Sequence, residues 1–377
     1  MSARDTIISV EAEIDATFAT SRLADLGFAQ AAWTLLSVNE DCFLKALHQL
    51  RQPQLDIFAD IHLNALTHPL RVCFQRGNKD DGPVRNEYVS DHYQLAWDWI
   101  QAAQDYVDFC TIFPLWHRDR LTIFLEDGRL IIDNPSNIRR EYEAYNRLVG
   151  KEGRVPPAIS PLADDLVDLL LAQTSYGEDC FRVNFTPQLV ARLVSVVSPA
   201  MALRYTLPDN WCFKSFTLRQ YRQILLTLQS MLYGWHRARA ELTNSGMKGL
   251  GYRSSVWVVS RNELTARLRR YTGVDGAVIG SVLDLITFGS SGIRAPDIAI
   301  QPLIDLGGQT YALAPFVWLN INVERNLCVL LNQIQQEREV YSRLVRDKEV
   351  ATRDEMRAFL VPFGFDLKWG KVGNFGP

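Results

Sequence analysis

Apolar residues recur at intervals of three and four over most of this 377-residue chain, and this spacing constrains its fold more than any other feature. Such a period places apolar side chains on one face of an α-helix, whereas a half-buried strand alternates every second residue. The helical period runs through the first 110 residues, residues 162–243 and residues 324–349. The sequence therefore predicts a mainly α protein with small β elements, an α+β arrangement.

Three short segments have the strand period instead. Residues 121–133 are the clearest hairpin, because two apolar runs flank Asp127-Gly128, a pair that accepts the positive φ of a tight turn. A second hairpin is expected around Gly307-Gly308. The third segment, residues 365–372, alternates apolar residues with polar residues or glycine and is predicted to be a strand.

These patterns divide the chain into four predicted regions. Residues 151–161 contain three prolines and interrupt the helical pattern, which favours a boundary there. The regions are a helical domain with a hairpin (1–150), a helical, basic region (162–250), a winged-helix-like module (251–322), and a long helix with the beginning of a further domain (323–377).

Composition and motifs argue against several classes of protein. No stretch reaches the ~18 uncharged apolar residues of a membrane helix, so no membrane is expected as a partner. Acidic residues interrupt the apolar run at the N-terminus, which argues against a signal peptide. The six scattered cysteines include no Cys-x-x-Cys pair, which indicates reduced thiols in the cytoplasm. No metal-ligand cluster, serine-hydrolase elbow or dinucleotide-binding motif follows from the spacing.

Charge is unevenly distributed along the chain, whose net charge is −3. Residues 1–70 carry four basic and nine acidic side chains, whereas residues 201–270 carry twelve basic and three acidic ones. A basic region on an acidic protein indicates a surface that faces a polyanion. In the alternative, the two charged regions neutralise each other within the fold. The predicted contacts to nucleic acid, without sequence preference, are Arg237, Arg239, Arg253, Arg267, Arg269 and Arg270.

Residues 251–322 have the order of elements of a winged helix. Ser260 and Glu263 form a capping box, a pair that satisfies backbone amides at the start of a helix. A second helix follows at residues 275–288, and then the hairpin around Gly307-Gly308. Because the second helix contains no lysine or arginine, it is not expected to read bases. The module is left with two possible uses: packing or protein contact, and DNA contact through the neighbouring arginines.

The last region begins with a long helix at residues 324–349. A second capping box, from Thr352 to Glu355, predicts a new short helix that Pro362 ends. Gly364 then leads the chain into the strand predicted at residues 365–372.

This order of acidic helix, glycine-aromatic turn and strand resembles the opening of restriction-endonuclease-like domains, the PD-(D/E)xK nuclease superfamily. The stretch DEMRAFLVPFGF carries the resemblance, which covers only residues 349–377. It implies Glu355 as the first catalytic carboxylate and Glu349 as the second, with magnesium as the cofactor. The family's later Asp strand and Glu-x-Lys strand do not follow in this sequence, so the chain as given is expected to lack nuclease activity. An ordinary capping role for Glu355 is the alternative.

The expected function is accordingly the nucleic-acid-sensing or regulatory portion of a bacterial nuclease whose catalytic core is missing from this chain. The resemblance suggests antiviral (anti-phage) defence as its setting. The alternative is a non-enzymatic scaffold or protein-interaction subunit. A basic surface on residues 201–270 would favour the first function, and buried or neutralised arginines would favour the second.

Overall fold

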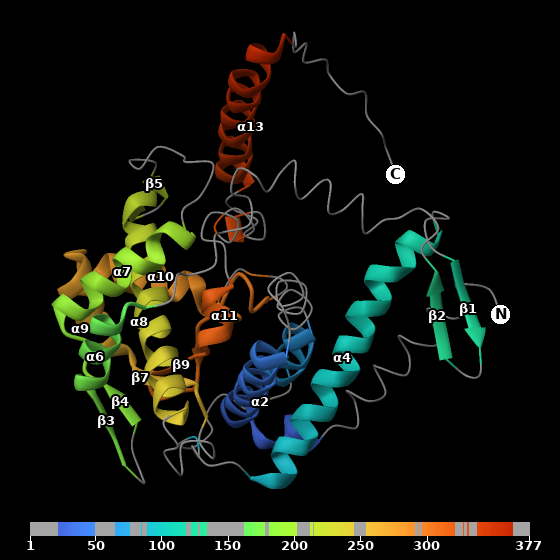
Figure 1. The fold of residues 1–377 in the computed structure, drawn as a ribbon, viewed down its shortest axis with the longest axis horizontal. Coiled ribbons are helices and arrows are strands. Elements are labelled where there is room, and N and C mark those ends of the chain that lie inside the picture. Colours follow the sequence, from blue (N-terminus) through green and yellow to red (C-terminus); the bar gives the residue numbers. More distant parts are fainter. Residues whose placement is uncertain are drawn as a thin grey trace.

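The fold is mainly helical, with small antiparallel sheets, and this confirms the predicted fold class (Figure 1). The computed structural model describes residues 22–49, 65–75, 84, 89–117, 122–126, 129–133, 162–177, 181–201, 212–213, 215–244, 254–290, 293, 296–320, 327, 330–331 and 338–364.

Helices account for most of the described residues. They are α2 (Phe28–Gln49), α4 (Ser90–His117), α6 (Asp164–Ala172), α7 (Pro187–Met201), α8 (Leu218–Asn244), α9 (Arg261–Thr272), α10 (Gly276–Ile286), α11 (Pro315–Leu319) and α13 (Arg338–Leu360). Short 3₁₀ turns lie at η1 (Arg22–Leu26) and η4 (Val361–Phe363), and residues 65–75 are also helical.

The strands pair only with antiparallel neighbours. The pairs are β1 (Thr122–Glu126) with β2 (Arg129–Asp133), β3 (Thr174–Tyr176) with β4 (Phe181–Val183), and β5 (Cys212–Phe213) with β6 (Phe216–Thr217). A sheet of three strands holds β7 (Trp257–Ser260), β9 (Thr310–Leu313) and β8 (Ile304–Asp305), in that order.

Both predicted hairpins are confirmed. Glu126 pairs with Arg129, so only two residues join β1 to β2, as the Asp127-Gly128 signal requires. Between β8 and β9, Gly307 and Gly308 have φ values of 82° and 56°, which glycine adopts without steric cost. The strand predicted at residues 365–372 lies outside the described residues.

The module expected between residues 251 and 322 has the order β7, α9, α10, β8 and β9. Strand β9 lies between β7 and β8 and pairs with both. Two helices between a first strand and a final hairpin, with α8 before them, are the arrangement that resembles a winged helix.

Both faces of the three-stranded sheet are buried. Successive strand residues point to opposite sides of the sheet, so each face contributes side chains to a different core. Trp257 and Val259 contribute to a first core shared with α7, α8, α9 and α10. Val256 and Ala312 contribute to a second core shared with α2 and α4. The N-terminal helices therefore cover the sheet face that α9 and α10 do not, and the exposed sides of α9 and α10 point away from them.

Helix α8 is the centre of the first core and contacts α7, α9 and α11. Its apolar side chains Leu225, Leu228 and Leu232 are buried. At Gly234 an added Cβ would lie only 2.7 Å from Cδ1 of Leu193, so glycine is needed where α7 crosses α8. The stripe predicted for this helix is thus its buried face.

The N-terminal helices are joined to the module by aromatic and polar contacts. The rings of Phe28 and Phe74 lie 5.2 Å apart, and those of Phe74 and Phe288 lie 5.9 Å apart, edge to face. Oγ of Ser37 lies 2.5 Å from Oγ of Ser254. The second core therefore joins parts of the first and third predicted regions, whose boundaries stay predictions.

One prediction about the last region is wrong. The second capping box does not begin a new helix, because α13 runs without a break from Arg338 to Leu360. Its i,i+4 ion pair between Glu349 and Arg353 spans the predicted start and stabilises a continuous helix. Pro362 and Gly364, with φ of 81°, then end the helical segment as expected. Within the described ranges, no helix combines the length and the apolar character needed to cross a membrane.

Candidate functional site

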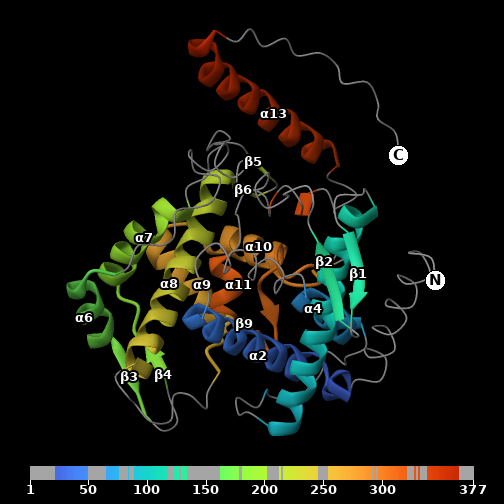
Figure 2. The same cartoon turned by 45° about the vertical axis from the view of Figure 1, so that its right-hand side comes forward.

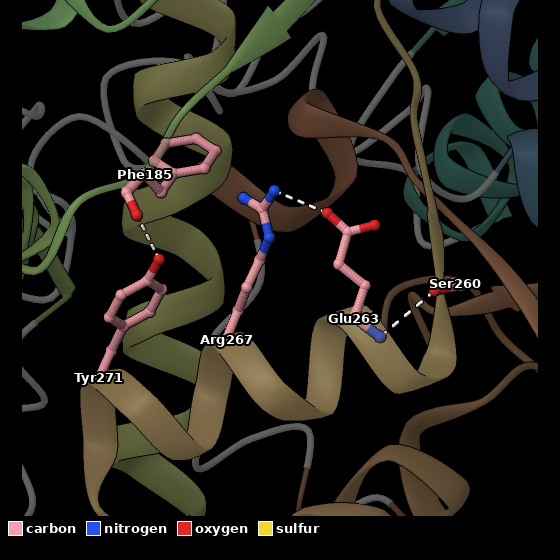
Figure 3. A network of polar contacts seen from close by, with 5 residues as sticks. All are labelled: Phe185, Ser260, Glu263, Arg267 and Tyr271. Carbon is pink, nitrogen blue, oxygen red and sulfur yellow. Dashed lines mark hydrogen bonds and ion pairs between the residues drawn. The ribbon is translucent and has the colours of Figure 1, made fainter.

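Helix α9 carries four arginines, and the residues at its two ends explain why it forms where it does. Oγ of Ser260 accepts a hydrogen bond from the Glu263 amide at 3.2 Å, which confirms this half of the predicted capping box (Figure 3). The Glu263 carboxylate turns instead towards Arg267. At the other end Gly273, with φ of 70°, closes the helix in the left-handed conformation.

Arg267 is half-buried, with its side chain 26% exposed, and does not lie largely outside as predicted. Its Nη2 donates to Oε1 of Glu263 at 2.6 Å, and its guanidinium lies 5.9 Å from the ring centre of Phe185 (Figure 3). The guanidinium also lies 5.7 Å from the ring centre of Trp257. Beside it, the Tyr271 hydroxyl donates to the Phe185 carbonyl, and burial raises the pKa of Tyr271. Arg267 therefore ties α9 to the first core, with its charge compensated by Glu263.

Two more of the predicted contacts, both on α8, have partners within the fold. Arg239 is only 6% exposed, and its Nη1 donates to the Ser254 carbonyl at 2.9 Å. Arg237 forms an ion pair with Glu241 one turn further along the helix. The prediction of a phosphate-facing surface is wrong for Arg239, because a buried guanidinium cannot reach a phosphate.

The three remaining predicted contacts are Arg253, Arg269 and Arg270. Arg269 and Arg270 are exposed in the last turn of α9, where positive charge also complements the helix dipole. Neither forms an ion pair with another residue of the described part of the chain. Arg253 lies outside the described residues.

An open groove of about 540 Å³ runs between α9 and α10. It is lined by Arg261, Asn262, Thr265, Ala266 and Arg269 from α9, and by Gly276, Ala277, Gly280, Ser281 and Asp284 from α10. At one end Nη2 of Arg261 lies 2.7 Å from Oδ1 of Asp284. At the other end lies the exposed Arg269.

The floor of this groove has little side-chain volume. A Cβ added at Gly280 would lie 3.7 Å from Nη2 of Arg261, and one added at Gly276 would lie 3.9 Å from Cγ2 of Thr265. Both are ordinary van der Waals distances, so packing within the chain does not require glycine at either position. Glycine inside a helix costs about 1 kcal/mol relative to alanine. The chain's own packing thus does not explain the cost in stability of glycine in the floor of this groove.

A buried acid lies where α2 meets the module. Glu40 is 1% exposed, its Oε1 accepts from the Phe316 amide at 2.7 Å, and Oγ of Ser255 lies 3.5 Å from Oε2. Burial, partly offset by these hydrogen bonds, raises the pKa of Glu40 to about 8. The carboxyl group is therefore mostly protonated at neutral pH and caps the start of α11.

The structure describes the side chain of only one of the two candidate catalytic acids. Glu349 is exposed, and its Oε1 lies 2.6 Å from Nη2 of Arg353. Glu355 lies in α13 by its backbone, and its side chain is outside the described residues. Across the described ranges, no group of three or more His, Cys, Asp or Glu side chains is placed to hold a metal ion.

Sequence reasoning missed the groove and Glu40. Gly280, in the interior of helix α10, was a signal for the groove, because glycine is unfavourable inside a helix. Glu40 had no signal, since its burial depends on Phe316, which is far away in the sequence. Comparisons with protein-family models, with curated proteins and with solved structures find no match to this chain.

Proposed function

We propose that this chain is a non-enzymatic protein-interaction subunit that binds a partner protein in the groove between α9 and α10. The observation that carries the proposal is the pairing and burial of the basic residues. Arg237, Arg239 and Arg267 are paired or buried. A polyanion would therefore meet less positive charge on α8 and α9 than their composition suggests.

The shape of the groove supports a protein partner. Small side chains allow the backbone of a partner segment to approach closely, and helices pack about 8–10 Å apart depending on the side chains between them. The walls offer one exposed arginine, one arginine–aspartate pair and several hydroxyl or amide groups. Such a mixed lining suits the polar rim of a protein interface better than it suits a phosphate backbone.

A photoreactive amino acid at Ser281, inside the groove, tests this proposal in the native cells of the protein. The expected result is a covalent adduct with a protein, lost when Gly280→Trp fills the groove. The matched control carries the same photoreactive residue at Asp168, which is exposed on α6. Equal adduct yields at the two positions would refute the groove as a docking surface.

A second candidate function is nucleic-acid sensing as the regulatory portion of a nuclease. The exposed pair Arg269 and Arg270 favours it. Two phosphate contacts would release about two counterions, so binding should be weak and should fall as salt rises.

Fluorescence anisotropy with unrelated DNA and RNA at low salt separates the two functions. The interaction proposal predicts no binding that depends on the pair. Binding that Arg269→Glu/Arg270→Glu abolishes, and that the matched Arg182→Glu control on β4 retains, would establish the second candidate instead.

A further inference from the structure

Helix α13 presents a second surface to solvent. In both views it stands above the body, apart from α9 and α10 (Figures 1 and 2). All of its described side chains are exposed apart from Leu360, which is half-buried.

One face of α13 combines acidic and small apolar side chains. Asp347, Val350, Asp354 and Ala358 follow one another at intervals of three, four and four residues, so they share one side of the helix. All four are exposed. The two aspartates are seven residues, or about 10.5 Å, apart along the helix axis.

The groove presents Arg269 at one end and the Arg261–Asp284 pair at the other, at a similar spacing. Arg261 and Arg269 both line it from α9 and are eight residues, or about 12 Å, apart along that axis. Between them the floor is formed by glycine and alanine, which leaves room for Val350, the residue between the two aspartates.

We propose that α13 of one copy of this chain docks in the α9–α10 groove of a second copy. This inference rests on the proposed function and names its partner. Asp347 faces Arg269, Asp354 faces Arg261 of the Arg261–Asp284 pair, and Val350 lies on the small-residue floor between them.

The remaining charges select this direction of α13 over the reverse. Arg357 follows Asp354 by one turn and therefore meets Asp284 at the end of the groove where Arg261 lies. In the reverse direction Arg357 would meet Arg269 and the positive end of the α10 dipole.

The contact joins two different surfaces, so it is head to tail and not self-complementary. Each copy can give its helix to one neighbour and receive the helix of another. Such a contact closes into a ring or continues as an open assembly.

Sedimentation equilibrium of the full chain tests the association. The wild-type weight-average mass should rise with concentration above 42.9 kDa. Asp347→Arg and Arg269→Asp should each weaken association by about tenfold, and the two changes together in one chain should restore it. The matched controls Asp168→Arg on α6 and Arg182→Asp on β4 should leave it unchanged.

Mixing two variants tests the head-to-tail geometry. Asp347→Arg impairs the docking face of α13, and Gly280→Trp fills the groove that receives α13 of another copy. At a concentration where the wild type associates, each variant alone should remain mostly monomeric, but the first keeps an intact groove and the second an intact helix. Their mixture should therefore form a pair of two chains and nothing larger.

Several results would overturn the inference: a mass of one chain at every concentration, equal effects of the control changes, or a mixture that stays monomeric. If the photoreactive residue at Ser281 captures a different protein while the chain stays monomeric, only the self-association is refuted. If it captures no protein, the proposed function fails as well.

Discussion

Replacing Glu40 by glutamine is expected to stabilise the protein at neutral pH. In the folded state burial holds the pKa of this carboxyl group at about 8, against an ordinary value of 4.5. Between these two values the unfolded chain releases the proton and the folded chain keeps it. Rising pH therefore favours the unfolded state over this interval.

The magnitude follows from the two pKa values. Each pH unit between them is worth about 1.4 kcal/mol, so the loss of stability is on the order of 3 kcal/mol at pH 7 and approaches about 5 kcal/mol above pH 8. Glutamine has the same shape, can accept from the Phe316 amide, and carries no titrating proton. Glu40→Gln should therefore recover most of that loss at pH 7 and little at pH 4.5, where the folded wild type is protonated and the unfolded one is half protonated.

Urea unfolding followed by tryptophan fluorescence measures this effect, because the chain contains nine tryptophans. The free energies of unfolding of wild type and Glu40→Gln should differ little at pH 5 and diverge steadily up to pH 8. Asp168→Asn, at an exposed position on α6, should follow the wild type throughout. Parallel curves for wild type and Glu40→Gln between pH 5 and 8, or a less stable glutamine variant at pH 7, would refute the reasoning.

Two further predictions concern packing and chemistry. Gly289→Ala should destabilise the chain by about 3 kcal/mol or more in urea unfolding, since its Cβ would lie 2.2 Å from the Phe74 ring at a φ of 72°. Gly276→Ala, whose added Cβ would make only ordinary contacts, is the matched control, and equal unfolding midpoints for the two variants would contradict the prediction. Magnesium should not induce cleavage of DNA or RNA by the purified chain, because metal-assisted hydrolysis needs several converging carboxylates; magnesium-dependent cleavage that Glu349→Gln or Glu355→Gln abolishes would contradict it and revive the nuclease assignment.

Local patterns in the sequence were sufficient for the main helices and for the two predicted hairpins, whereas the short strands β3 to β7 were not predicted. The leucines of α8, the cap at Ser260 and the turn at Gly307-Gly308 each depend on residues close by in the chain. The helix start predicted near Thr352 was wrong, although it also rested on a local pattern. A capping pattern is also compatible with the interior of a helix, and the ion pair of Glu349 with Arg353 favours the continuous helix.

Which arginines remain available to a partner was decided by tertiary structure. Arg239 and Arg269 are both arginines of a basic segment, and the composition of that segment does not separate them. Arg239 is buried because the residues before β7 pass over α8, whereas Arg269 stays exposed because the last turn of α9 faces away from the core. Burial and charge pairing depend on contacts between residues far apart in the sequence. The sequence by itself therefore determined the elements and the excess of charge, and only their packing determined where that charge is exposed.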